Sequence, residues 1–151
     1  MPKKIPQGFN TVTPSLTVNG AAKAIELYKK AFGAKEEYRM ECDDGSGKIM
    51  HACIQIGDSK LFLADTNPKM GCGTPSVSSF YVYLNDVDAA FKQAKQAGCS
   101  ETYPVQDMFW GDRTGSLKDS FGIQWTLATH VREVSPKEME EGRKKFMSKA
   151  A

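Results

Sequence analysis

The sequence predicts an α+β fold: two βαβββ modules whose strands form a curled, mostly antiparallel sheet cup with helices on the outside, plus a C-terminal helix. The first supporting observation is a repeated order of strand, asparagine, helix and glycine. Asn19 and Asn85 each follow a strand-like segment, and Gly33 and Gly98 close the helical segments, at offsets of 65 to 66 residues. The second is the alternation of apolar and polar residues around both helices, which is typical of half-buried strands. These patterns predict similar modules at about residues 11–66 and 77–131.

The first module opens with a predicted strand at residues 11–18. Its sequence TVTPSLTV alternates between polar and apolar residues, and Pro14 favours an edge position or a bulge because proline cannot donate a ladder hydrogen bond. Asn19 is expected to cap the following helix, which ends at Gly33. Further strands are expected at residues 35–42, 48–56 and 60–65.

The second module repeats this order. Residues 77–84 alternate as a strand, and Asn85 is expected to cap a helix that Gly98 ends. A short strand at 114–118 and another at 123–129 are expected to form a hairpin around the turn DSFG. Trp125 falls on the apolar side of that alternation, so we expect it in the core.

The tail after the modules predicts one more helix. Ser135, Pro136 and Glu138 have the spacing of a helix N-cap, first-turn proline and capping box. Gly142 lies inside that helix and weakens it by about 1 kcal/mol relative to alanine, so we expect it to order against a partner subunit, as a lid or a dimer arm. The expected organisation is an N-terminal extension at 1–10, a domain at 11–134 and a helical tail at 135–151.

Composition excludes several classes of protein. The net charge is +2, and no basic stripe with interleaved aromatic residues occurs, so nucleic acid is not an expected partner. No apolar run approaches the roughly 20 residues of a membrane span, and the N-terminus lacks the apolar region of a signal peptide. The four cysteines form no CxxC pair, which favours reduced, structural thiols. We therefore expect a cytoplasmic protein without a membrane partner.

A candidate ligand site follows from the polar sides of the strands. If helices cover one side of the sheets only, the other side lines the cup. The strand residues that we expect to contact a ligand there are Thr13, His51, Cys53, Leu63, Asp65, Ser79, Tyr81 and Thr126. The alternative is an ordinary solvated sheet face.

The segment FWGDR offers a second group of ligand contacts. Phe109 and Trp110 supply aromatic surface, and Arg113 is able to clamp a carboxylate or phosphate of a ligand. Alternatively, Asp112 and Arg113 pair with each other and pin the loop before the hairpin. Both readings stay open at the level of sequence.

Three segments together resemble a known superfamily: TPSLTVNGAAKAIELYKKAFGA, KIMHACIQIGDSKLFLAD and FWGDRTGSLKDSFGIQWTLATH. They are similar to the vicinal oxygen chelate superfamily, also called the glyoxalase/bleomycin-resistance/dioxygenase group, and within it to the PhnB-like branch. The resemblance runs from Thr11 to about Val134. The chain departs from the branch at Ser120, where proline is usual, at Ile123, where histidine is usual, and at Cys53, where an acidic residue is common.

The resemblance also implies a metal site that this chain does not fit. Glyoxalase-like members hold a divalent metal through one side chain each from the first, fourth, fifth and eighth strands. The matching positions here are Thr13, Leu63, Ser79 and Thr126, none of which is an imidazole, thiolate or carboxylate donor. We therefore expect no metal or other cofactor. The alternatives are a metal site rebuilt from His51, Cys53 and Asp65, or metal-free acid–base catalysis by His51 or Asp65.

The resulting functional prediction is a protein that binds or sequesters a small molecule of unknown identity and forms a homodimer. Its resemblance to bleomycin-resistance members and its cup of aromatic and hydroxyl side chains favour this function. An enzyme of the glyoxalase-like lyase/isomerase or dioxygenase type is the alternative. A dimeric scaffold without any ligand is a third.

Overall fold

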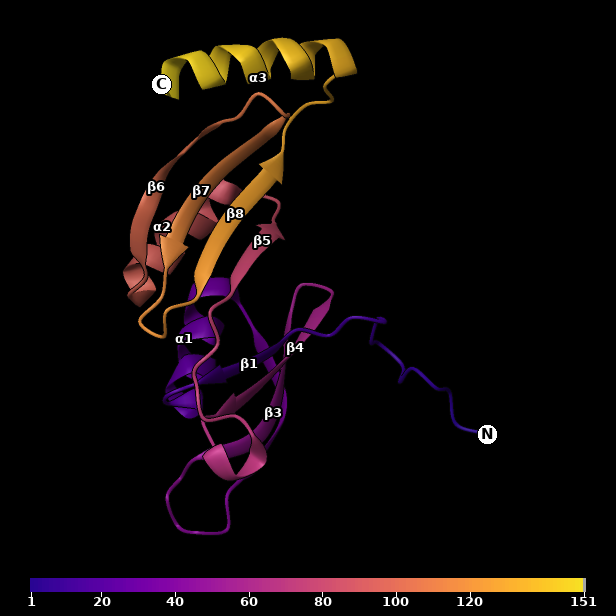
Figure 1. Cartoon of the computed structure of the whole chain (residues 1–151), viewed down its shortest axis with the longest axis vertical. Helices are drawn as coiled ribbons and strands as arrows, with labels where there is room; N and C mark the ends of the chain where they lie inside the picture. Colours follow the sequence, from indigo (N-terminus) through magenta and orange to yellow (C-terminus); the bar gives the residue numbers. More distant parts are fainter. Residues whose placement is uncertain (151) are drawn as a thin grey trace.

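The computed structural model describes residues 1–150 and contains two four-stranded sheets and three α-helices (Figure 1). In chain order the elements are β1 (Ser15–Val18), α1 (Ala21–Phe32), β2 (Lys35–Glu41), β3 (Ile49–Ile56), β4 (Ser59–Asp65), a 3-10 turn η1 (Pro68–Met70), β5 (Ser79–Tyr83), α2 (Val87–Ala97), β6 (Ser100–Asp107), β7 (Asp112–Lys118), β8 (Gln124–His130) and α3 (Pro136–Ala150). Each half of the chain is thus a βαβββ module, which confirms the predicted α+β class.

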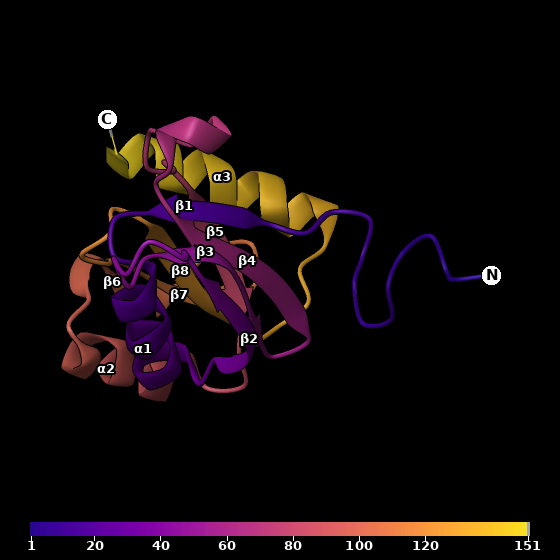
Figure 2. The ribbon, with the colours of Figure 1, turned by 90° about the horizontal axis from the view of Figure 1, so that it is seen from below.

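The two sheets have the same topology. Their strand orders are β1-β4-β3-β2 and β5-β8-β7-β6. The first strand of each module pairs in parallel with the last, and the other pairs are antiparallel. Consequently β1 and β5 are edge strands, as the proline at position 14 predicted for the first of them. Helices α1 and α2 lie together on one side of the sheets, and α3 lies on the other side (Figure 2).

The core lies between the sheets and α1 and α2, where both helices bury an apolar stripe. Trp125 is 1% exposed, which confirms its predicted place in the core. It packs edge-on against Tyr28 of α1, with the two ring centroids 5.1 Å apart. A residue of the second module therefore packs directly on the helix of the first.

A buried carboxylate connects the two modules at the same place. Asp119, in the turn after β7, accepts hydrogen bonds from the Tyr28 hydroxyl at 2.7 Å and from Trp125 Nε1 at 2.9 Å. The backbone amides of Phe121 and Ile123 donate to its other oxygen. With four donors and 5% exposure, the carboxylate is fully satisfied in a buried position. The turn DSFG is therefore a structural joint between the modules.

The helix starts differ from the predictions, although both helices end as predicted. The N-cap of α1 is Gly20, and Asp65 of β4 accepts from the amides of Gly20 and Ala21. The N-cap of α2 is Asp86, whose side chain accepts from the Ala89 amide. The predicted caps Asn19 and Asn85 were wrong, because a side chain from outside the helix and a neighbouring aspartate satisfy the first amides.

Several strand boundaries also differ from the predicted ones. The first strand begins at Ser15, four residues after the predicted start. Pro14 cannot donate to β4, and only its carbonyl takes part, by accepting from the Phe62 amide at 2.9 Å. In the second module β6 is a complete strand that the alternation did not single out, and β7 begins at Asp112.

Helix α3 crosses the end of the second sheet where β6 and β8 finish and β7 begins (Figure 1). The predicted capping box is confirmed, since Ser135 Oγ accepts from the Glu138 amide and Glu138 accepts from the Ser135 amide. Gly142 packs so closely on Phe109 that an added Cβ would lie 2.5 Å from the Phe109 Cβ. The glycine thus allows α3 to dock on its own chain. None of the helices in residues 1–150 combines the length and the apolar character needed to cross a membrane.

Candidate functional site

The side of each sheet that faces away from α1 and α2 is the open face. In the second sheet the register places Tyr81, Thr126 and Ser116 opposite one another on this face, since paired residues share a side. By the same alternation Tyr83, Asp112 and His130 belong to it. Three strands therefore bring two tyrosines, a carboxylate and an imidazole to one surface.

These four side chains form a hydrogen-bonded group around Asp112, which we call the Asp112 cluster: Tyr81, Tyr83, Asp112 and His130. Both tyrosine hydroxyls donate to Asp112 Oδ2, at 2.7 Å from Tyr81 and 2.9 Å from Tyr83. His130 Nδ1 lies 2.7 Å from Asp112 Oδ1. Asp112 is 2% exposed, whereas the two tyrosines are 45% and 62% exposed. A buried carboxylate therefore fixes two phenol rings that remain open to a ligand.

The cluster shifts the proton affinities of its members. Burial raises the pKa of Asp112, but the hydrogen bonds from Tyr81, His130 and Tyr83 outweigh it and lower the pKa below its ordinary value. Burial, followed by the bond to Asp112, raises the pKa of Tyr81 to about 12. The bond to Asp112 and a second one to Glu133 raise the pKa of His130. Asp112 is thus held as a carboxylate and the phenols as donors.

The loop before β7 adds aromatic surface to the cluster. Trp110 Nε1 donates to the Tyr81 hydroxyl at 3.2 Å, and Trp110 stands edge-on to Phe109 with ring centroids 4.9 Å apart. Gly111 makes this loop possible: its φ is 97°, and an added Cβ would lie 2.2 Å from the Arg132 carbonyl oxygen. Phe109 and Trp110 were predicted as ligand contacts. Trp110 contacts the cluster, whereas Phe109 packs against Trp110 and against Gly142 and Phe146 of α3.

Other predicted contacts in the second sheet divide between its two sides. Ser79 and Thr126 lie on the open face with Tyr81, and Thr126 Oγ1 is 2.9 Å from Ser116 Oγ. Arg113 lies on the helix side instead, where its guanidinium binds Asp88 of α2 at 2.8 Å and Asp107 of β6 at 3.2 Å. The proposed ligand clamp and the proposed pairing with Asp112 were therefore both wrong. Successive strand residues point to opposite sides, so Asp112 and Arg113 cannot share one.

In the first sheet His51 and Cys53 lie on the open face, as predicted, but away from the Asp112 cluster. His51 Nε2 is 3.0 Å from the Tyr38 hydroxyl, and the centroids of the His51 and Phe62 rings are 4.6 Å apart. Cys53 is fully buried, and burial followed by the charge of Glu37 raises the pKa of its thiol. Thr13 precedes β1 and is half-buried.

Leu63 and Asp65 lie on the opposite side of the first sheet, which corrects their predicted place in the cup. Leu63 is 0% exposed and belongs to the core. Asp65 binds the amides that begin α1 and, through its other oxygen, the Ile49 amide at 2.7 Å. The alternation along β4 was identified correctly but assigned to the wrong side. A metal site made of His51, Cys53 and Asp65 is excluded, because the sheet separates Asp65 from the other two.

The positions that the superfamily uses for a divalent metal carry no side chains in this protein that would ligate one well. Of the four matching residues, Leu63 points into the core, and the other three are hydroxyl-bearing side chains. Within the part of the chain that the structure describes, no group of three His, Cys, Asp or Glu side chains is arranged to hold a metal ion. The residues present therefore do not fit the metal of the glyoxalase-like enzymes.

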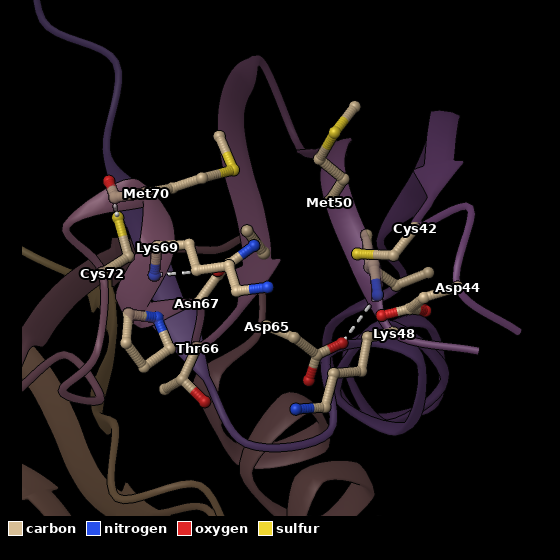
Figure 3. Close-up of a pocket in the computed structure, with 13 residues that line it drawn as sticks. Cys42, Asp44, Lys48, Met50, Asp65, Thr66, Asn67, Lys69, Met70 and Cys72 are labelled. Atoms are coloured by element: carbon tan, nitrogen blue, oxygen red, sulfur yellow. Dashed lines mark hydrogen bonds between the residues drawn. The ribbon is translucent and has the colours of Figure 1, made fainter. Parts of the chain in front are cut away.

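A separate cavity of about 330 Å³ lies beside Asp65, between the end of β2, the start of β3 and the loop after β4 (Figure 3). Cys42 and Met50 line one wall, and Met70 and Cys72 come from the loop opposite. Of the predicted site residues Asp65 lines this cavity, and its carboxylate already accepts from three backbone amides.

Sequence reasoning missed His130 as a site residue, and it treated Asp112 only as a partner of Arg113. The signal for His130 was present, since this residue continues the alternation of Gln124, Thr126 and Ala128. What the alternation did not reveal is that Asp112 lies across from His130 in the ladder.

The comparisons with known proteins agree with this architecture. The family model of the Glyoxalase/Bleomycin resistance protein/Dioxygenase superfamily matches residues 8–127. An uncharacterized protein of Mycobacterium bovis, Mb0911c, is 37% identical over 138 residues, covering 85% of this chain and 89% of that protein.

Solved structures share the fold at lower identity. TioX from Micromonospora sp. ML1 superposes with a TM-score of 0.67 at 24% identity, covering 81% of this chain and 99% of TioX. A Bacillus cereus PhnB protein, described as a putative 3-demethylubiquinone-9 3-methyltransferase, gives 0.64 at 19% identity, covering 80% and 99% of the two chains. With the doubled βαβββ architecture and the family match over most of its length, the chain belongs to the Glyoxalase/Bleomycin resistance protein/Dioxygenase (vicinal oxygen chelate) superfamily, and it has a PhnB-like structural neighbour.

Proposed function

We propose that this protein binds a small, planar organic molecule at the Asp112 cluster and does so without a divalent metal. The observation that carries the proposal is the buried Asp112 carboxylate. It accepts hydrogen bonds from both tyrosine hydroxyls and so fixes two rings that remain largely exposed. Rings fixed in this way lose little conformational entropy when a ligand stacks on them. Exposed aromatic side chains gathered on one surface are typical of a binding site.

The hydrogen bonding of the cluster defines the polarity of the ligand. Both phenol protons point inward to Asp112, so the hydroxyl oxygens can only accept from a ligand. The Tyr81 oxygen already accepts from Trp110 Nε1, which leaves Tyr83 as the freer acceptor. We therefore expect a flat ring system that carries N–H or O–H donors, stacked on Tyr81, Tyr83 and Trp110.

We further propose that the working unit is a homodimer. Strand β5 is at a sheet edge, and in residues 1–150 it pairs only with β8. The outer edge of β1 is partly covered, because Ser76 Oγ accepts from the Thr17 amide and the Ser76 amide donates to the Thr17 carbonyl. Exposed edges favour pairing with another copy, and a twofold axis would repeat such a contact symmetrically. Light scattering coupled to gel filtration tests this proposal, and a monomer mass at micromolar concentration would contradict it.

A thermal-shift screen tests the binding proposal. The panel consists of planar heteroaromatic compounds, each with at least one N–H or O–H donor. At a hundredfold excess over its Kd, a ligand stabilises the folded protein by about 2.7 kcal/mol, which corresponds to a Tm rise of about 5 to 10 °C at this chain length. Compounds that stabilise the wild type should bind Tyr83→Phe about fivefold more weakly, for the loss of one hydrogen bond.

Tyr38→Phe is the matched control, because Tyr38 is 40% exposed on the other sheet and lies outside the cluster. It should bind the same compounds as tightly as the wild type does. Equal binding by Tyr83→Phe and the wild type would refute the proposed contact. Elemental analysis after dialysis against nickel, zinc, iron and manganese tests the metal-free part, and near-stoichiometric metal would refute it.

The Asp112–His130 pair supports a second candidate, metal-free acid–base catalysis. A buried carboxylate that hydrogen-bonds Nδ1 orients the imidazole and favours its protonated form. These residues replace His51 and Asp65 as the candidates for catalysis, since Asp65 is buried and accepts from three backbone amides, and His51 hydrogen-bonds the Tyr38 hydroxyl rather than a carboxylate. Turnover of a bound compound that His130→Gln abolishes, with its Kd unchanged, would establish an enzyme.

A further inference from the structure

A second concave surface lies beneath helix α3. It is a groove of about 570 Å³ between α3, the end of β6 and the loop before β7. Three aromatic rings line it, from Tyr103, Phe109 and Phe146. The volume lies within the range of small-molecule sites. We call this surface the α3 groove.

The charges around the α3 groove are mostly positive. Arg132, Lys145 and Lys149 line it. Arg132 has only a distant ion-pair partner, Glu138 at 3.9 Å, and no carboxylate in residues 1–149 lies within ion-pair distance of Lys145. The one acidic residue in the lining, Asp107, already binds the Arg113 guanidinium. The groove therefore combines an apolar lining with cations whose charge is not neutralised locally.

The spacing along α3 produces this combination. Lys145 and Phe146 each lie three or four residues from both Gly142 and Lys149, so all four residues lie on one face of the helix. Gly142 lets that face approach Phe109, and Phe146 completes the aromatic lining with its ring centroid 5.7 Å from that of Phe109. The acidic Glu140 lies elsewhere on the helix and binds Arg143 at 2.7 Å. The groove face is thus selectively basic and aromatic.

We propose that the α3 groove binds an amphipathic anion, a molecule with one carboxylate or similar acid group on an apolar body. The apolar body would lie against Phe109, Phe146 and Tyr103, and the acid group would lie between Lys145, Lys149 and Arg132. This site is separate from the Asp112 cluster and does not depend on the function proposed for it. It is formed by a helix that lies outside residues 8–127, which the family model matches.

Trp110 provides a spectroscopic readout for the groove, and the lysine variants distinguish groove binding from binding at the Asp112 cluster, which Trp110 also contacts. Its ring is edge-on to Phe109, so a ligand that contacts Phe109 changes the surroundings of the indole. The other tryptophan, Trp125, is buried in the core and supplies a constant background. Titration with octanoate, followed by Trp110 fluorescence and by calorimetry, measures binding, and 1-octanol is the uncharged comparison of equal chain length.

The expected result is saturable binding of octanoate that is at least tenfold tighter than binding of 1-octanol. Each exposed cation should contribute about threefold to fivefold, so Lys145→Ala/Lys149→Ala should weaken octanoate binding about tenfold. Lys137→Ala/Lys144→Ala removes the same charge from the same helix outside the groove and should change binding less than twofold. A second variant, Gly142→Ala, should also weaken binding, because its Cβ displaces α3 from Phe109.

Four results would overturn the proposal. They are no saturable octanoate binding, 1-octanol bound as tightly as octanoate, equal loss in the two double-lysine variants, and binding to phosphatidylglycerol vesicles without binding to octanoate. The last result would identify α3 as a membrane-surface helix instead.

Discussion

The hydrogen bond from Tyr28 to Asp119 joins the two modules, and its removal should destabilise the whole chain. In Tyr28→Phe the ring keeps its packing on Trp125, and only the hydroxyl is lost. Asp119 then retains three of its four donors at a site that is 5% exposed. A hydrogen bond to a charged group contributes about 1.5 to 3 kcal/mol, so the free energy of unfolding should fall by that amount.

Urea denaturation followed by tryptophan fluorescence measures this loss, since Trp125 donates to the same carboxylate. For a chain of this length the corresponding fall in Tm is about 3 to 12 °C. Tyr38→Phe is the control, because its hydroxyl binds His51 at an exposed position, and its stability should stay within about 0.5 kcal/mol of the wild type. A loss below about 0.5 kcal/mol in Tyr28→Phe would refute the reasoning, as would two separate unfolding transitions in the wild type.

Three further predictions concern single side chains. Asp65→Ala leaves the first amides of α1 and the Ile49 amide without their acceptor, so unfolding free energy should fall by about 2 kcal/mol or more in urea denaturation; an unchanged midpoint would contradict the capping role. The pKa of His130 is raised in the folded state. The contribution of its ion pair with Asp112 to the free energy of unfolding is therefore fully present below about pH 6.5 and is lost as pH rises through the folded-state pKa. His130→Gln should therefore lower Tm at acidic pH and converge with the wild type at alkaline pH; a constant difference across the range would be inconsistent with the ion pair. Gly142→Ala should speed proteolysis within α3, although alanine favours helix by about 1 kcal/mol, because its Cβ collides with Phe109; slower proteolysis would show that α3 does not dock there.

Several local features of this chain follow from its sequence alone, although the helix N-caps and some strand starts did not. The offset between the two glycine-terminated helices established the doubled module, because glycine adopts the left-handed C-cap conformation at little cost and so ends many helices. Trp125 and Leu127 lie on the same side of β8, and the apolar character of that set, rather than the alternation alone, placed Trp125 in the core. The capping box at Ser135 and Glu138 marked the start of α3 for the same kind of local reason.

The tertiary structure decided which side of each strand meets the helices and which distant residues meet each other. Alternation divides a strand into two sets of residues, but it does not assign either set to the core. That ambiguity put Leu63 and Asp65 in the predicted cup, whereas packing against α1 places them on the helix side. Asp112 and His130 are 18 residues apart and become partners only through the β7–β8 register. In the sequence alone Gly142 only lowers the helix propensity of α3. In the structure the same glycine allows α3 to pack against Phe109.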